Sequence, residues 1–389
     1  MHGTAVSSTP SAATDWVAAL SPWPEEFGLE RMHALLAELG DPQLAFPSIH
    51  VVGTNGKSTT TRLTAALLRG AGLRVGAYTS PHVAGWWERL DTDPAGLERA
   101  VRRVRKPAER LGATQFEVLT AAALAEFAEQ RVDVAVVEAG LGGRLDATNV
   151  LRAPVAVLTN VGLDHTEQLG ETRAEIAAEK LAVVNGGATV VLCETEWEAL
   201  ARSSGAGAVV LTGRSNLALA VAAAETFLGD VVDPSVVEGL SLPGRLERRG
   251  ERPLEIWDGA HNLEGVGWLL PRLPDRHYVV VASILRDKNV DGMLAALSTV
   301  GDTLVATASS NSRALPAEEL ATLARRWFAR TETERDPAGA VGLARSIAGA
   351  EGAVLVTGSL YLLTDLAARA EELASGAKGA WASTSSPRS

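Results

Sequence analysis

The sequence is poor in cysteine and in long apolar runs. Cys193 is the single cysteine among 389 residues, which excludes an internal disulfide and favours a reducing compartment. The N-terminal stretch lacks the basic start and apolar core of a signal peptide, and no window approaches eighteen consecutive apolar residues. We therefore expect a cytoplasmic protein that does not associate with membranes.

Positive charge is also scarce. The formal net charge of -11 argues against nucleic acid as the main partner, because phosphate-backbone binding needs a basic surface. The 36 basic residues include only five lysines, namely Lys57, Lys106, Lys180, Lys288 and Lys378. A lysine kept against this preference for arginine indicates a place where an amine is needed. Lys57 and Lys180 are candidates, whereas we interpret Lys106 and Lys378 as surface residues.

The apolar runs predict an α/β fold. Nine runs read as strands, at 48–52, 74–78, 132–139, 155–159, 188–192, 253–257, 278–283, 302–308 and 353–357. They are nearly continuous and alternate with helical patterns, which is typical of parallel sheets covered by helices on both faces. In such sheets, ligands bind at the carboxyl ends of the strands.

The length predicts two domains, since 389 residues exceed one ordinary core. Proline, glycine and charged residues interrupt the pattern at 241–255, so we place the boundary near Gly250. The expected divisions are a disordered segment 1–15, an ATP-binding parallel-sheet domain 16–249, a smaller Rossmann-like α/β domain 250–373 and a disordered tail 374–389.

A phosphate-binding loop follows the first expected strand. It consists of Gly53, Thr54, Asn55, Gly56, Lys57, Ser58 and Thr59. The two glycines permit backbone N–H groups to turn inward, the lysine can reach terminal phosphates, and the hydroxyls open a helix whose positive end favours an anion. The strict pattern would place glycine at position 51, where this chain has Val51, so the loop is a shortened variant. The order of its parts disfavours an ordinary strand-to-helix turn.

Two further clusters follow strand ends. Glu138 ends one strand before a glycine-rich turn that leads to Arg144, Asp146 and Asn149. A carboxylate there suits magnesium in a phosphoryl-transfer enzyme, although Glu138 could instead cap a neighbouring helix.

The other cluster places Asp164 and His165 after a strand, and a helix then leads to Lys180. By itself, a histidine such as His165 is more often structural than a ligand. Three clusters at strand ends together favour a functional site.

These segments resemble one family. They are "GTNGKST", "YTSPH", "TQFEVLTAAAL", "VVEAGLGGRLDATNV", "GLDHTEQLGETRAEIAAEK", "LPGRLE", "WDGAHN", "NSRALPAEEL" and "LVTGSLYLL". In this order, from about residue 20 to 370, they resemble the dihydrofolate synthase and folylpolyglutamate synthase family, a branch of the Mur ligases. The resemblance implies a Mur-ligase-type fold: a phosphate-loop domain followed by a smaller α/β domain.

The resemblance also implies a reaction. ATP would phosphorylate the carboxylate of dihydropteroate or a folate, and the amino group of L-glutamate would then displace phosphate. A carboxylate is a poor electrophile, so the enzyme must position the reactants and neutralise charge. The implied cofactor is Mg²⁺, as two ions. Because the cleft of two domains suffices for this chemistry, we expect a monomer.

By resemblance, Ser80 and Glu138 bind one magnesium ion and His165 helps to bind the second. Lys180 matches a lysine that is carbamylated in the family, which requires a neutral amine and hence a depressed pKa. The alternative is a helix-surface ion pair between Lys180 and Glu175 or Glu179. We assign catalytic roles to Lys57, His165 and Lys180.

The remaining site residues also come from the resemblance. Asn216, Arg245 and Asp258 match positions that contact ATP. Thr114, Gln115, Phe116 and Glu117 match a stretch lining the pterin pocket, and Arg144 and Asp146 are placed on the substrate side. His261 and Ser359 match the glutamate side of the second domain. For Phe116, core packing is an equally good interpretation.

The chain departs from the family mainly on the acceptor side. "GWWERLD" stands where a Phe-Asn-Glu-Arg stretch is usual, and the connection to "TQFEVL" looks shortened. Two alternatives therefore stay open besides folate ligation. One is a Mur-type ligase for another carboxylate acceptor, and the other is an ATP-binding relative that has lost ligation.

Overall fold

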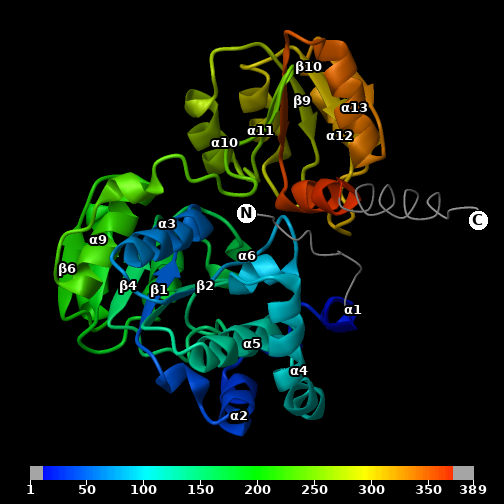
Figure 1. Cartoon of the computed structure of the whole chain (residues 1–389). Coiled ribbons are helices and arrows are strands. Elements are labelled where there is room, and N and C mark those ends of the chain that lie inside the picture. The colour runs from blue at the N-terminus through cyan, green and yellow to red at the C-terminus, as the bar shows by residue number, and fades with distance from the viewer. Residues whose placement is uncertain (1–11, 371–389) are drawn as a thin grey trace, which may run out of the picture. The chain divides into compact units, whose positions relative to one another are not determined.

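The computed structural model describes residues 12–370 and divides them into two compact units (Figure 1). The N-terminal unit comprises 12–81 and 86–240, and the C-terminal unit comprises 82–85 and 241–370. The segment 374–389 and most of 1–15, which we expected to be disordered, lie outside the described residues. Residues 12–15 begin a helix.

The N-terminal unit is built on a six-stranded parallel sheet in the order β2-β3-β1-β4-β5-β6. Its strands are β1 (Ser48–Val52), β2 (Val75–Tyr78), β3 (Val134–Glu138), β4 (Val155–Leu158), β5 (Thr189–Leu192) and β6 (Ala208–Leu211). Its α-helices are α1 (Ala12–Ala19), α2 (Glu30–Glu38), α3 (Lys57–Gly70), α4 (Pro94–Leu111), α5 (Gln115–Glu129), α6 (Thr166–Leu169), α7 (Arg173–Leu181), α8 (Glu198–Ser203) and α9 (Asn216–Leu228). The 3-10 helices are η1 (Pro42–Leu44), η2 (Trp86–Leu90), η3 (Thr195–Trp197) and η4 (Pro234–Val237).

Side chains of this sheet alternate between two covered faces. Ile49 and Val51 of β1 pack in a core with α3 and α9, whereas Val52 packs on the opposite face with α7 and α8. Helices α2, α4 and α5 complete that opposite face over Val137 of β3. Burial on both faces explains why these strands are nearly continuous apolar runs.

The C-terminal unit has a mixed six-stranded sheet in the order β11-β10-β9-β12-β8-β7. Its strands are β7 (Glu247–Glu251), β8 (Leu254–Trp257), β9 (Tyr278–Ala282), β10 (Thr303–Ala306), β11 (Arg330–Thr333) and β12 (Ala353–Thr357). Its helices are α10 (Leu263–Leu269), η5 (Leu270–Arg272), α11 (Val290–Leu297), α12 (Ala317–Ala324) and α13 (Pro337–Ala348), and residues 360–370 are also helical. Only β7 is antiparallel, through its pairing with β8.

The structure confirms all nine expected strands and the α/β class, but it adds three strands and shifts the division of the chain. The added strands β6, β7 and β11 lie at sheet edges and are partly exposed. The sequences of β7 and β11 are polar, whereas β6 is a short apolar run that we did not interpret as a strand. Residues 241–249, which we assigned to the first domain, belong to the C-terminal unit because β7 pairs with β8. The division therefore falls at Leu240 and not near Gly250.

Candidate active site

The phosphate loop connects β1 to α3 and its backbone requires glycine at two positions. Gly53 has φ +150°, and a Cβ there would lie 1.8 Å from Oγ1 of Thr159. Gly56 has φ +82°, and a Cβ there would lie 2.4 Å from Oδ1 of Asn216. Both glycines therefore combine a left-handed conformation with a close neighbour, which no L side chain could accommodate without a shift. Asn216, the first residue of α9, thus lies against the loop.

Lysine and hydroxyl groups stand at the N-terminal end of α3. Lys57 is the first residue of this helix, and its Nζ donates to the carbonyl oxygen of Thr54 at 3.2 Å. Ser58 follows and donates through Oγ to Oε1 of Glu138 at 2.9 Å. Because the N-terminal end of a helix carries partial positive charge, this arrangement suits a phosphate group.

Glu138 is almost completely buried at the carboxyl end of β3, with 1% of its surface exposed. Besides the Ser58 hydroxyl, it accepts a hydrogen bond through Oε2 from the backbone N–H of Ser80 at 2.9 Å. Ser58, Ser80 and Glu138 therefore lie together beside the phosphate loop. A buried carboxylate with neighbouring hydroxyls suits a hard cation that also takes oxygen ligands from a nucleotide.

His165 and Asp164 follow β4 on a constrained turn. His165 has φ +52°, and its backbone N–H donates to Oδ1 of Asp164 at 3.0 Å. A histidine in the left-handed region persists only when surrounding contacts hold it there. Across residues 12–370, no three His, Cys, Asp or Glu side chains form a group that could hold a metal ion. A metal site here would therefore depend on hydroxyl and nucleotide oxygens as well.

Lys180 lies behind the phosphate loop, with 3% of its surface exposed. Its Nζ donates to the carbonyl oxygen of Gly53 at 2.9 Å. Burial and then the nearby charge of Lys57 lower the pKa of Lys180 to about 7, while Asp164, Asp146 and Glu179 oppose the shift. A fraction of neutral amine at pH 7 follows from this pKa.

The contacts of Lys180 differ from the alternative interpretation, a helix-surface ion pair with Glu175 or Glu179. Glu179 pairs with Nε of Arg144 at 3.1 Å, and Glu175 forms the capping box of α7 with Thr172. Lys180 instead points inward to the loop.

Lys180 makes the stability of the protein depend on pH. Its folded-state pKa of about 7 lies below the ordinary value of 10.5, so the unfolded chain binds more protons between these pH values. The free energy of unfolding should therefore receive a contribution that rises with pH in this window. Lys180→Met cannot bind a proton, so the stability of the wild type relative to this variant should increase from pH 7 to pH 9. Denaturant titration in CO₂-depleted buffer measures the difference, and a constant difference would contradict the pKa.

The glycine-rich turn after β3 is shaped by Asp146. This buried carboxylate accepts hydrogen bonds from the backbone N–H groups of Leu141 at 2.8 Å and Thr148 at 3.0 Å. Burial raises the pKa of Asp146, and these hydrogen bonds oppose the shift. Arg144 is mostly exposed and pairs with Glu179. Asp146 therefore holds the turn from inside, while Arg144 is on its surface.

The four residues assigned to the pterin pocket have different surroundings. Thr114 caps α5 in a capping box with Glu117, and the Glu117 carboxylate also pairs with Nε of Arg31 at 2.8 Å. Both are buried, and their described contacts are structural. The Gln115 side chain donates to the carbonyl oxygen of Val17 at 3.0 Å.

Phe116 is the one member of this stretch that contacts the glycine-rich turn. A Cβ at Gly140 would lie 2.5 Å from Cζ of Phe116, and the ring centroids of Phe116 and Tyr78 are 6.0 Å apart. Phe116 is only partly buried. Phe116 therefore packs against the core ring of Tyr78 and also lies beside the glycine-rich turn.

A second cluster lies within the C-terminal unit, at the carboxyl ends of β8 and β12. Asp258 accepts from the backbone N–H groups of Leu246 at 2.8 Å and Ala260 at 2.9 Å. Burial raises the pKa of Asp258, and the charge of Arg245 opposes the shift. Arg245 lies close to Gly259, whose carbonyl oxygen is 2.9 Å from Nδ1 of His261.

Ser359 follows β12 and is also part of this edge. It is buried, and its Oγ accepts from the backbone N–H of Tyr361 at 3.2 Å. Gly358, directly before it, donates to the carbonyl oxygen of Ala260 at 3.0 Å. The structure therefore brings together the four site residues predicted in the C-terminal unit: Arg245, Asp258, His261 and Ser359.

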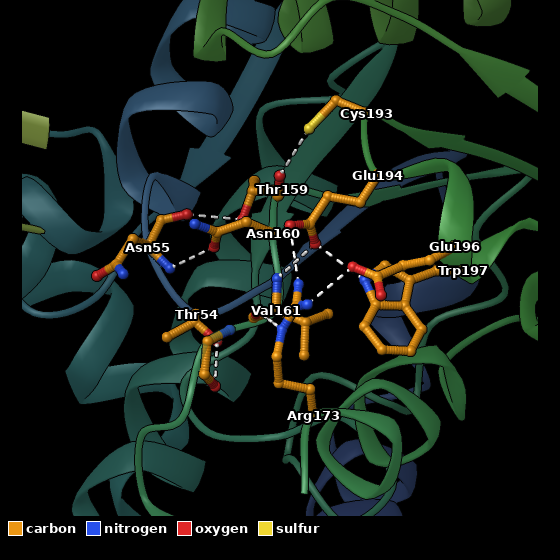
Figure 2. Close-up of polar contacts among 11 residues, drawn as sticks. Thr54, Asn55, Thr159, Asn160, Val161, Arg173, Cys193, Glu194, Glu196 and Trp197 are labelled. Carbon is orange, nitrogen blue, oxygen red and sulfur yellow. Dashed lines mark hydrogen bonds and ion pairs between the residues drawn. The ribbon is translucent and has the colours of Figure 1, made fainter. Parts of the chain in front are cut away.

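Two residues that hold the phosphate loop from behind, Thr159 and Asn160, were not predicted from the sequence. Thr159 donates through Oγ1 to the carbonyl oxygen of Asn55 at 2.7 Å, and Oδ1 of Asn160 accepts from the Asn55 N–H at 2.8 Å (Figure 2). The polar pair Thr159-Asn160 at the end of an apolar run was the available signal. Its contact with the phosphate loop could not be predicted, because it depends on the order of the strands, in which β4 lies beside β1.

Two family models match the chain. The Mur ligase middle domain matches residues 51–227, and the Mur ligase glutamate ligase domain matches residues 244–360. Among the described residues, no helix is long and apolar enough to cross a membrane.

The chain is also similar to named relatives and to solved structures of this kind of ligase. The dihydrofolate synthase/folylpolyglutamate synthase of Mycobacterium tuberculosis is 34% identical, over 84% of this chain and 84% of its own length. The structure of E. coli FolC in complex with DHPP and ADP is 28% identical with a TM-score of 0.83, covering 95% of this chain and 100% of that one. The Yersinia pestis bifunctional folylpolyglutamate synthase/dihydrofolate synthase with Mn, AMPPNP and L-glutamate bound is 29% identical with a TM-score of 0.81, covering 95% and 100%.

Proposed function

This chain belongs to the Mur ligase family, in its dihydrofolate synthase/folylpolyglutamate synthase branch, and from this we propose how its residues carry out ATP-dependent ligation of L-glutamate. The acceptor is dihydropteroate, a folate or both. The observation that carries the proposal is the convergence of Lys57, Lys180 and the buried Glu138 on one glycine-shaped loop. Two lysines and a carboxylate around a phosphate loop suit transfer of a phosphoryl group to an acceptor carboxylate.

The loop fits the phosphates of ATP. Because Gly53 and Gly56 carry no side chain, Thr159 and Asn216 can approach the loop closely, and Thr159 also bonds to the carbonyl oxygen of Asn55. Lys57 starts α3 directly after the turn, so its charge and the helix end act on the same anion. We assign nucleotide contacts to the whole loop, to Asn216, and to Arg245 and Asp258 of the C-terminal unit.

The surroundings of Glu138 fit a divalent cation. Ser58, Ser80 and Glu138 would hold Mg²⁺ through oxygen, which is the ligand type this ion prefers. When bound, the ion neutralises charge on the nucleotide phosphates. We retain His165 as a residue that helps to hold a second ion and Lys180 as a carbamylated residue. The lowered pKa and burial of Lys180 support the latter, because CO₂ reacts with the neutral amine.

We assign each of these residues a separate role in the reaction. Lys57 stabilises negative charge on the phosphoryl group while it moves to the acceptor carboxylate, forming an acyl phosphate. The amine of glutamate attacks the acyl carbon and phosphate leaves, so no protein nucleophile is needed. His261 and Ser359 are placed to bind glutamate in the C-terminal unit. Phe116, with the glycine-rich turn around Asp146, forms one wall on the acceptor side.

The observed contacts also refine four assignments on the acceptor side. Thr114 and Glu117 cap α5, Asp146 supports the glycine-rich turn and Arg144 pairs with Glu179. We therefore propose that the main role of these four residues is to shape the acceptor site, and that their direct contact with the acceptor is secondary. The single cysteine supports a cytoplasmic location, and we keep the monomer as part of the proposal.

Product analysis tests the proposed function. Purified protein is incubated with ATP, Mg²⁺ and L-glutamate, together with dihydropteroate, tetrahydrofolate or no acceptor. We expect phosphate release that depends on an acceptor, and mass spectrometry should show addition of one or more glutamyl groups. ATP binding without a glutamylated product from either acceptor would favour another carboxylate substrate or a non-catalytic relative.

A further inference from the structure

Two charged side chains of the N-terminal unit bond to the backbone of one residue that the proposed chemistry does not use. This residue is Val161, between β4 and the turn that carries His165. Its N–H donates to Oε2 of Glu194 at 2.9 Å, and its carbonyl oxygen accepts from Nε of Arg173 at 2.9 Å (Figure 2). Trp197 donates through Nε1 to the same Glu194 oxygen at 2.9 Å.

The two charged groups are also joined to each other. Nη2 of Arg173 lies 3.1 Å from Oε1 of Glu194, and Nη1 lies 2.9 Å from Oε1 of Glu196. The Arg173 guanidinium stands 5.3 Å from the ring centroid of Trp197. The Glu194 side chain is largely buried. Because the partners fix both charges, the pair is more rigid than an exposed ion pair. We call Arg173 and Glu194 the Val161 clamp.

The clamped segment lies directly against the phosphate loop. The carbonyl oxygen of Asn160 accepts from the N–H of Thr54 at 3.0 Å, and its side chain accepts from the N–H of Asn55. On the other side of Val161, the N–H of Gly162 donates to Oγ1 of Thr54 at 2.9 Å. The residues before and after Val161 therefore both bond to the loop, which couples the position of Val161 to that of Thr54 and Asn55.

Helix α7 is connected to the loop near both of its ends, by Arg173 of the clamp and by Lys180. Arg173 is the first residue of α7 and acts through Val161, whereas Lys180 near its end donates directly to Gly53. Glu194 follows β5. The clamp thus ties a helix and a strand end to the loop that holds the nucleotide.

We propose that Arg173 and Glu194 are positioning residues that hold the phosphate loop and the His165 turn in the geometry that binds nucleotide. The inference rests on the proposed function, since it assumes that this loop binds the phosphates of ATP. Neither residue touches the reacting atoms in this account. Their effect passes through the backbone of Val161 and through Asn160.

Glu194→Ala should weaken ADP binding measured by calorimetry with Mg²⁺ by about 10-fold, because the buried N–H of Val161 loses its acceptor. Hydrogen exchange in the peptide containing Thr54 and Asn55 should become faster. The kcat of acceptor-dependent phosphate release should fall, while the KM for glutamate should stay close to that of the wild type. Arg173→Ala should give the same pattern, and the double variant should lose little more than either single variant.

Arg202→Ala is the matched control, because it removes an exposed ion pair with Glu198 on the nearby α8 and leaves the clamp intact. Its ADP affinity and exchange should equal those of the wild type. If an alanine variant does not fold, Glu194→Gln and Arg173→Lys test the same point. Each keeps part of the clamp, so each should show a smaller shift in the same direction.

Wild-type ADP affinity and wild-type exchange at Thr54 and Asn55 in the folded clamp variants would overturn the proposal, even if their melting temperatures fell. These readouts do not depend on ligase turnover. If the wild-type protein glutamylates neither acceptor, the proposed function fails, while ADP binding and exchange still decide whether the clamp positions the loop.

Discussion

Lys57→Ala is expected to reduce acceptor-dependent phosphate release by about 1,000-fold, whichever acceptor is used. Lys57 is the cation at the N-terminal end of α3, directly after the loop that Gly53 and Gly56 shape. Alanine removes the charge that stabilises the moving phosphoryl group but leaves the backbone cradle. The loss should therefore fall mainly on kcat, with a smaller effect on ADP affinity.

Lys57 also acts on Lys180, and the variant tests this link. The charge of Lys57 is the second cause of the lowered pKa of Lys180, after burial. In Lys57→Ala, the pKa of Lys180 should consequently rise. Titration of the Lys180 amine by NMR with selectively labelled lysine would measure the direction.

The matched control is Lys106→Ala, since Lys106 is an exposed lysine of α4 in the same unit. It should retain wild-type turnover, and both variants should unfold near the wild-type temperature. Near-wild-type phosphate release by a folded Lys57→Ala variant would show that the loop does not hold the transferred phosphate.

Glu138→Gln is expected to lower kcat by about 100-fold and to raise the Mg²⁺ concentration needed for half-maximal rate. Glutamine keeps the size of the side chain and one acceptor oxygen for Ser58 or Ser80. It removes the negative charge that would attract the ion, and it places an NH₂ group where the second oxygen accepts a hydrogen bond. The measurement is a magnesium titration of initial rates at saturating ATP.

Glu126→Gln provides the control for this change. Glu126 is also buried in the N-terminal unit, but it pairs with Arg103 at 3.2 Å on the side of α5 that faces α4. Its substitution should lower stability without altering the magnesium requirement. If Glu138→Gln showed the same magnesium dependence as the wild type, the metal would have to be held elsewhere.

Much of the fold followed from elementary patterns, because the central strands of both sheets are covered on two faces. Such strands are mostly apolar, so the nine runs that became the inner strands and the edge strand β2 could be predicted from the sequence. The strands β7 and β11 were not visible, since one side of an edge strand faces solvent or a loop and their sequences are polar. The apolar edge strand β6 was missed although its four residues form an apolar run. Missing β7 also displaced the expected domain boundary, because its pairing with β8 decides to which unit 241–249 belong.

The candidate site divides in the same way. A short segment contains everything that shapes the phosphate loop locally: glycines at Gly53 and Gly56, then Lys57 and two hydroxyls. The neighbour that makes each glycine necessary comes from a distant part of the chain. Thr159 and Asn216 reach the loop only because β4 lies beside β1 and α9 packs against α3.

Local sequence thus determined the phosphate loop, the strand ends that bear Glu138 and His165, and the two lysines kept against an arginine-rich background. Tertiary structure alone decided which of these groups meet. Only in the folded chain does Lys180 point inward to Gly53, Glu117 take part in the cap of α5, and Arg173 and Glu194 bond to the backbone of Val161. The physical reason is that backbone conformation and apolar periodicity are properties of neighbours in sequence. Hydrogen bonds and ion pairs between strand ends depend on the order of strands in the sheet.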